Sequence, residues 1–269
     1  MSLRINNNVE AFNAHRQLAM TSTTAAKSME RLSSGFRINR AADDAAGLAI
    51  SEKLRGQIRG LSQAQRNAQD GVSLVQTAEG SLNEVHSMLQ RVRELAVQYQ
   101  NGTLSTSDKA AITAEAQQLS KEIERIGTTA DFNGIKLLDG SQTTISFQVG
   151  ANDADTISVT TASLGQKIGG TVGDLDVTTS TAIAGIDKAI EAVSTLRGSF
   201  GAVQNRLEHT LNNLATYQEN LMASESRIRD VDMAAEMVEF SKNQILQQAG
   251  TSMLAQANQA PQAVLSLLR

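Results

Sequence analysis

Apolar residues recur at alternating intervals of three and four along the first half of the chain. The pattern starts at Gly47 and continues for 53 residues to Tyr99, and Gln57 is the one clearly polar residue on it. Such spacing predicts a long helix with a heptad seam that other helices must cover. Glycine destabilises a helix interior by about 1 kcal/mol relative to alanine. Because several glycines interrupt the first part of the pattern, we expect a bend or a non-helical stretch before Gly60.

Two further helices are predicted to follow. One begins at Ser105–Asp108, where the serine can cap the helix and the acidic side chain favours its N-terminus, and its apolar stripe extends to Ile126. The other begins near Ala182, and its apolar stripe extends to Ile228. The residues expected to pack these helices together are Leu82, Val85, Leu89, Val92, Leu207, Leu211 and Leu214.

Between these helices the pattern changes from heptad to alternating. Asn133–Gly134 is a hairpin signal, and residues 144–149 and 156–160 alternate apolar and polar side chains around a turn at 150–153. The whole region 129–181 is rich in Ser, Thr and Gly, and we expect an exposed excursion there. The expected fold class is therefore mainly α, with long antiparallel helices forming coiled-coil-like rods and a small β-hairpin region in the middle.

The last segment of the chain carries another strict heptad run, the first segment mirrors it more weakly, and both contain few large apolar residues. The residues that we expect on these seams are Ile5, Val9, Phe12, Leu246, Met253, Ala257, Val264 and Leu267. Thin helices with few large apolar residues cannot bury themselves, so we expect both ends to hold a stable fold only against another surface. Pro261 lacks an amide hydrogen, and the last helix is predicted to kink or fray there.

The composition excludes several kinds of protein. The chain of 269 residues has no Cys, no Trp, one Pro and 3% aromatic residues. Large rings normally build a thick core, so their scarcity indicates a thin molecule. The absence of Cys excludes disulfides, thiolate metal sites and cysteine nucleophiles. Neither a cleaved secretory signal nor a membrane-spanning segment is recognisable, so we expect a soluble chain without membrane insertion.

Charge is unevenly distributed along the chain. Residues 1–66 contain ten Lys and Arg against five acidic residues, whereas the whole chain has a net charge of −4. A basic segment can bind nucleic acid. Here the basic residues alternate with Ala, Gly and Leu, and no aromatic stacking platform accompanies them, which favours a solvated or self-complementary face and no nucleic-acid partner.

No pattern of residues indicates catalysis. The chain has no standard Gly-rich phosphate loop, no H-E-x-x-H and no G-x-S-x-G. Its histidines, His15, His86 and His209, lie on separate helical segments. Asp43 and Asp44 are adjacent and would point apart on a helix, so they fit a helix start better than a catalytic carboxylate pair. We therefore expect no enzymatic activity, no metal and no cofactor.

Seven methionines within the predicted helices allow two interpretations. The thioether side chain is flexible and polarisable, so these residues could form an adaptable binding surface. We favour the second interpretation, in which they fill the core and the seams. The residues are Met20, Met29, Met88, Met222, Met233, Met237 and Met253.

Segments near both ends of the chain resemble bacterial flagellins. Residues 32–50, LSSGFRINRAADDAAGLAI, are similar to the N-terminal signature of that family. Residues 247–259, QQAGTSMLAQANQ, and the final LSLLR are similar to its closing segment. The resemblance extends over about residues 1–140 and 182–269, which is nearly the whole chain.

The resemblance implies a structural subunit that is exported through the flagellar type III apparatus and polymerises into the extracellular flagellar filament for motility. Residues 1–44 and 229–269 would pair as the inner-tube coiled coil. Residues 45–228 would form a rod-like outer-tube domain, with the hairpin excursion at about 129–181. The implied partners are further copies of the chain, an export chaperone, and the cap and hook–filament junction proteins.

One segment, Leu89–Leu95, resembles the motif that the vertebrate flagellin-sensing Toll-like receptor recognises. The residues that match contact positions are Gln90, Arg91, Leu95 and Glu115, which Ile186 and Ile190 join from the returning helix. The resemblance also implies that this surface packs neighbouring subunits in a filament. Recognition of the free monomer by the host receptor is then an expected consequence of the assembly surface.

Two alternatives remain open. A hook–filament junction protein would also have helical seams at its ends, although the closing Leu-Leu-Arg and the nearly continuous flagellin-like ends argue against it. A helical binding module that acts as a soluble monomer would keep stable ends, whereas this sequence predicts frayed ends.

Overall fold

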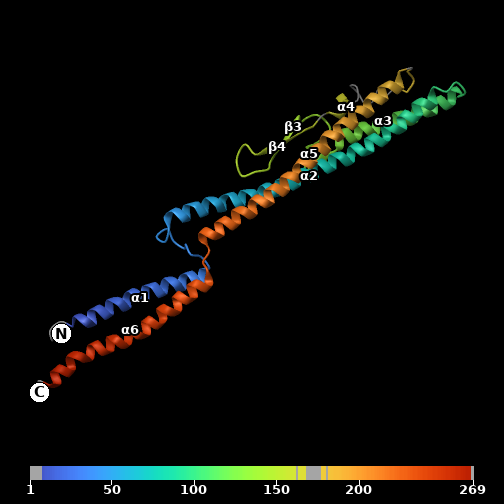
Figure 1. The fold of residues 1–269 in the computed structure, drawn as a ribbon. Helices are drawn as coiled ribbons and strands as arrows, with labels where there is room; N and C mark the ends of the chain where they lie inside the picture. Colours follow the sequence, from blue (N-terminus) through green and yellow to red (C-terminus); the bar gives the residue numbers. More distant parts are fainter. Residues whose placement is uncertain (1–7, 162, 168–176, 180, 268–269) are drawn as a thin grey trace. The chain divides into compact units, whose positions relative to one another are not determined.

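The computed structural model describes residues 8–161, 163–167, 177–179 and 181–267. Long helices dominate it, with two short hairpins in the middle of the chain (Figure 1). The helices are α1 (Val9–Ser34), α2 (Ala45–Tyr99), α3 (Thr106–Thr129), α4 (Leu164–Lys167), α5 (Ala182–Arg229) and α6 (Met233–Leu267). The strands are β1 (Asp131–Phe132), β2 (Ile135–Lys136), β3 (Thr144–Gln148) and β4 (Thr156–Thr160). The predicted fold class is confirmed.

The chain divides into two compact units. The first, which we call the terminal unit, consists of Met1–Gly56 and Asn220–Arg269. The second, the central unit, consists of Gln57–Glu219. The long helices α2 and α5 each contribute residues to both units.

In the central unit, α2, α3 and α5 lie side by side and bury apolar side chains along their length (Figure 1). The heptad seam of α2 forms the middle of this core, because its apolar residues from Leu61 to Ala96 are buried. Leu211 is partly buried against the cluster that contains Leu207. The other expected packing residues are all buried, namely Leu82, Val85, Leu89, Val92, Leu207 and Leu214.

Local sequence explains where α3 begins. The Ser105 hydroxyl accepts a hydrogen bond from the Asp108 amide at 3.2 Å, and the Asp108 carboxylate accepts one from the Ser105 amide at 3.1 Å. These reciprocal bonds form a capping box, which satisfies donors that the first helical turn leaves unpaired. The hydrogen bonds from Ser105 also lower the pKa of the Asp108 carboxyl, because they favour its charged form.

Two antiparallel hairpins follow α3. The turn between β1 and β2 contains Asn133 and Gly134 at positive φ, as the Asn-Gly signal requires. In the second hairpin, Phe147 lies opposite Ile157, and both contact the core. The opposite face of this hairpin carries Ser and Thr. Residues 162, 168–176 and 180 of the predicted excursion lie outside the described residues.

Of the two features expected before Gly60, the non-helical stretch is wrong, because α2 is helical from Ala45 to Tyr99, and the bend stays a prediction. Packing explains two of its glycines. A Cβ atom at Gly60 would lie 3.2 Å from the Ala151 side chain, and one at Gly71 would lie 3.3 Å from Phe147. These positions therefore let the β3–β4 hairpin approach α2 closely, and the contacts offset the low helix propensity of glycine.

In the terminal unit, α1 and α6 lie side by side (Figure 1). The Asn8 side chain caps α1 by accepting a hydrogen bond from the Ala11 amide at 3.0 Å. The helix ends at Gly35, whose φ of 75° is the left-handed conformation that glycine adopts without strain. At the other end of the chain, α6 continues through Pro261 to Leu267, so the helix does not end at the proline.

Candidate self-assembly surface

One face of α6 packs against α1, and its residues recur every seven positions. Glu236 lies 3.5 Å from Arg31, and a Cβ atom at Gly250 would lie 3.2 Å from Leu18. The side-chain Nδ2 of Asn8 donates a hydrogen bond to the backbone carbonyl of Ala257 at 2.7 Å. Asn243 completes this row and is 5% exposed. The row is therefore a heptad seam, but its side chains are polar or small.

The α1 side of the seam has the same character. Its buried residues are Thr21, Ala25 and Ser28. Several buried polar atoms at the seam lack a hydrogen-bond partner among the described residues, including Nδ2 of Asn243, Oε1 of Glu236 and Nε of Arg31. Such atoms lose hydration without compensation. The seam thus gains little hydrophobic stabilisation within a single chain.

Apart from Leu18, which contacts Gly250 at the seam, many large apolar side chains of both helices are exposed. Phe12 is 71% exposed, Val238 is 70% exposed and Ile245 is 66% exposed. We call this set the uncovered apolar residues, and it comprises Val9, Phe12, Met20, Met29, Met233, Met237, Val238, Ile245, Leu246 and Met253. Val9, Phe12, Leu246 and Met253, which the sequence placed on the terminal seams, belong to this set. Ile5 and the side chains of Val264 and Leu267 lie outside the described residues.

The uncovered apolar residues of α6 occupy more than one side of the helix. Val238 and Ile245 are seven residues apart and form one row, and Leu246 and Met253 form another. Neither row coincides with the one that faces α1. A helix that is apolar on several sides is normally surrounded by other elements, and apolar surface of this kind marks an interaction site. The terminal helices therefore present an incomplete core.

The segment between α1 and α2 is held by the end of α5. The Arg37 amide donates a hydrogen bond to the Arg229 carbonyl at 2.7 Å, and the Arg229 guanidinium lies 4.9 Å from the Phe36 ring centre. The same guanidinium contacts Glu52 at 2.7 Å. This hydrogen bond, with the nearby charge of Arg55, lowers the pKa of the Glu52 carboxyl. Sequence reasoning missed Arg229, although it directly precedes the break before α6.

Asp43 and Asp44 have the structural role expected for a helix start. The Asp44 carboxylate accepts a hydrogen bond from the Gly47 amide at 2.8 Å. Asp43 lies 2.7 Å from Nζ of Lys27 and accepts hydrogen bonds from the amides of Asn39 and Arg40. The bond from Lys27, with those from the backbone, lowers the pKa of Asp43 to about 2. Both aspartates fix the loop that precedes α2.

The residues that match the receptor motif, which we call the receptor-like patch, include both exposed and buried side chains. Gln90, Arg91 and Glu115 are exposed, and Arg91 forms ion pairs with Glu115 at 2.9 Å and with Glu94 at 3.0 Å. Hydrogen bonds to Glu115 and Glu94 raise the pKa of the Arg91 guanidinium. The three remaining members lie inside or at the edge of the core, with Leu95 and Ile186 at 1% exposure and Ile190 partly buried. Only the polar part of the patch is available to a partner in this conformation.

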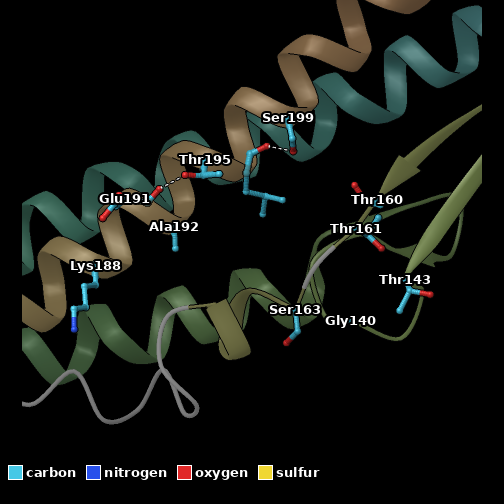
Figure 2. A pocket seen from close by; sticks show the side chains of 11 residues that line it. Gly140, Thr143, Thr160, Thr161, Ser163, Lys188, Glu191, Ala192, Thr195 and Ser199 are labelled. Carbon is cyan, nitrogen blue, oxygen red and sulfur yellow. Dashed lines mark hydrogen bonds between the residues drawn. The ribbon is translucent and has the colours of Figure 1, made fainter.

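One groove of the central unit lies between α5 and the second hairpin and has a volume of about 830 Å³. Figure 2 shows Lys188, Glu191 and Thr195 along α5 and Thr160 and Thr161 at the hairpin, all of which line the groove. The Thr195 hydroxyl donates to the Glu191 carbonyl and the Thr161 hydroxyl to the Gln142 carbonyl, so these groups are engaged within the chain.

Metal-binding clusters and membrane-spanning helices can be searched for among the described residues. Within residues 8–161, 163–167, 177–179 and 181–267, no group of three or more His, Asp or Glu side chains could hold a metal ion. No helix in those ranges is long and apolar enough to cross a membrane.

The methionines do not fill the core as expected. Six of the seven that the structure describes are exposed, and Met88 alone packs against the core of the central unit. The interpretation as seam filling is therefore wrong within the single chain. The reason is that small and polar residues occupy the seam of α1 and α6, which leaves the methionines on the outer faces of these helices.

Comparison with known proteins gives consistent matches along the chain. Residues 5–143 match the family model of the bacterial flagellin N-terminal helical region, and residues 183–268 match that of the C-terminal helical region. A flagellin of Halalkalibacterium halodurans is 57% identical over 98% of this chain and 99% of its own length. A flagellin of Bacillus subtilis is 51% identical over 99% and 100%, respectively. The crystal structure of Bacillus cereus flagellin has 35% identity and a TM-score of 0.50, and the match covers 55% of this chain and 88% of that one.

Proposed function

The chain belongs to the bacterial flagellin family, and we propose that the uncovered apolar residues of α1 and α6 form the surface through which its copies assemble. Flagellins are structural proteins, and this chain is a structural subunit of the extracellular flagellar filament rather than an enzyme. It polymerises with itself. The open question is which residues carry the assembly.

One observation carries the proposal. The seam between α1 and α6 buries Thr21, Ser28 and Asn243, whereas Phe12 and Ile245 remain exposed. A folded protein normally buries its large apolar side chains first, because each contributes about 1.5–3 kcal/mol on burial. The reverse arrangement is stable only if neighbouring copies cover the apolar faces. Contacts that repeat from one copy to the next without closing into a ring produce a helical filament.

The same argument supports the division expected from the resemblance. We assign residues 1–44 and 229–269 to the inner layer of the filament and residues 45–228 to the outer layer. The sequence boundaries of the two compact units fall after Gly56 and before Asn220 instead. The first turns of α2 and the last turns of α5 accordingly serve as supports for the inner layer, through contacts such as Arg229–Glu52. We also propose the export chaperone and the cap and junction proteins as partners of the uncovered apolar residues before and at the ends of assembly.

A charged substitution tests the assembly surface. Ile245→Asp places a carboxylate at a 66% exposed position, so helix content should be unchanged in the monomer. Growth from filament seeds, measured by sedimentation and negative-stain microscopy, should be lost, because the charge would be buried against the next copy. Ile135→Asp is the matched control, since Ile135 is also exposed but lies on the β1–β2 hairpin. Normal growth of the Ile245→Asp chain would contradict the proposal.

We propose, in addition, that the host flagellin-sensing Toll-like receptor recognises the monomer through Gln90, Arg91 and Glu115. Their exposure and the ion pairs of Arg91 support this role, because the pairs hold two helices in a fixed geometry at the surface. Leu95 and Ile186 are buried and are proposed to position α2 and α5 beneath the patch.

Alanine substitution of Arg91 should weaken receptor signalling by purified monomer at least about tenfold, because a truncated arginine anchor commonly costs 2 kcal/mol or more. Arg125→Ala is the control. Arg125 is an exposed arginine of α3 that pairs with Glu122 three residues away, as Arg91 pairs with Glu94, but it lies outside the patch. A receptor reporter assay with monomer of verified helix content measures both. Equal signalling by the two variants would remove the patch from the receptor contact.

A further inference from the structure

The exposed methionines are confined to one part of the molecule. All six lie in the terminal unit, and Met88 of the central unit is packed against the core. Five of them lie on α1 and α6, with exposed fractions from 48% to 64%, and we call these the terminal methionines: Met20, Met29, Met233, Met237 and Met253. Methionine is among the residues most often buried. Such exposure on two helices is therefore unusual.

No thiol in the chain competes with these thioethers for an oxidant. The chain contains no Cys, so methionine supplies its only sulfur atoms. An exposed methionine reacts with peroxides, because the sulfur lone pair attacks one peroxide oxygen. The O–O bond breaks, the sulfur loses two electrons and gains that oxygen, and the second oxygen leaves as water. The product, methionine sulfoxide, is polar and disrupts interfaces rich in methionine.

We propose that the terminal methionines are a reversible oxidation site that blocks addition of the chain to a filament. The inference rests on the proposed assembly surface, to which all five terminal methionines belong. A sulfoxide oxygen buried against an apolar neighbour has no donor to satisfy it, and its burial opposes association. Once the chain is assembled, the neighbouring copies cover the same sulfur atoms and protect them. Oxidation therefore acts on chains before assembly and spares those already in the filament.

The test compares monomer and filament of the full chain under one dose of hydrogen peroxide. Peptide mass spectrometry locates the sulfoxides, and sedimentation after seeding measures growth. We expect oxidation of the terminal methionines in the monomer, little in the filament, and a fall in seeded growth of about tenfold or more. Treatment with the two methionine sulfoxide reductases, one for each epimer, should restore growth.

A variant with leucine at all five terminal methionines is the control, because leucine conserves volume and is not oxidised. It should grow equally with and without peroxide. If the variant cannot grow at all, repair of the oxidised native chain decides the matter: restored growth supports the proposal and unrestored growth overturns it. Growth of the oxidised chain at the untreated rate, or equal oxidation in monomer and filament, would also overturn it. Failure of the untreated chain to polymerise would instead overturn the proposed assembly surface.

Discussion

At the scale of single residues, the loop before α2 depends on the charge of Asp43. Its folded pKa of about 2 lies below the ordinary value of 3.8, because the charged carboxylate accepts hydrogen bonds from Lys27 and from the amides of Arg40 and Asn39. A depressed folded pKa contributes stability above the unfolded pKa, and that contribution is lost as the pH falls through the folded pKa. The stabilisation is therefore complete above about pH 4 and disappears near pH 2.

Substitution of Asp43 by Asn tests this linkage. The variant should unfold at a lower temperature than the native chain at pH 7, because the amide cannot form the ion pair with Lys27. The difference between the two melting temperatures should shrink as the pH falls from 4 to 2. Circular dichroism at a series of pH values measures it. Asp70→Asn, at an exposed position on α2, should change neither quantity.

Two glycines of α2 should respond to alanine with opposite signs. A Cβ atom at Gly47 would lie 2.8 Å from the buried Ile38 side chain and 2.4 Å from the Asp44 carboxylate, so Gly47→Ala should destabilise the chain by about 1–3 kcal/mol. At Gly56 no described atom outside the helix's own local backbone lies within 4 Å, so Gly56→Ala should stabilise it by about 1 kcal/mol. Urea unfolding measures both, and a gain in stability at Gly47 would refute the assigned contact with Ile38.

At the scale of elements, the sequence predicted those features whose cause is local. The start of α3 follows from the Ser105 and Asp108 side chains, and the first hairpin turn follows from Asn133–Gly134, since each involves neighbours in the chain. The continuity of α2 through Gly60 could not be predicted in this way. The contact that favours it comes from Ala151, which is distant in sequence.

The register of α1 against α6 could not be predicted from the sequence either. A heptad pattern shows that an apolar stripe exists, but it does not show which partner covers that stripe. The large residues Phe12 and Met253 suggested the seam, whereas Ala25 and Asn243 occupy it. In the proposed assembly surface the stripe contacts other copies of the chain, and no property of a single sequence distinguishes contacts within a chain from contacts between chains. The self-assembly residues expected from the sequence therefore stay a prediction about contacts between copies.

Asn243 offers a test of the polar seam. Its Nδ2 is buried and lacks a hydrogen-bond partner within the described part of the chain, which costs about 1–3 kcal/mol. Asn243→Leu should therefore slow hydrogen exchange of the α1 and α6 amides, and it should broaden the distribution of filament forms, because a buried polar residue fixes helix register. Gln244→Leu, at an exposed neighbouring position, is the control and should leave the exchange unchanged. Faster exchange in Asn243→Leu would indicate that the amide stabilises the seam.

At the scale of the whole molecule, the folded core and the proposed assembly surface use separate sets of residues. The buried clusters of the central unit draw their residues from 57–219 alone, and they include Leu82, Phe200 and Leu207. The uncovered apolar residues all lie in the terminal unit. A change in one set should therefore leave the property that depends on the other set largely intact.

Deletion of residues 229–269 makes this separation testable. The truncated chain loses α6 and the Arg229 contacts, but it keeps every residue of the central core, so slow hydrogen exchange should persist in α2, α3 and α5 between residues 57 and 219. Polymerisation should be abolished, because two rows of the assembly surface are absent. Hydrogen-exchange mass spectrometry and seeded sedimentation measure the two properties on one sample. Filaments from the truncated chain would show that the central unit carries assembly, whereas loss of protection in α2 would show that the two units fold as one.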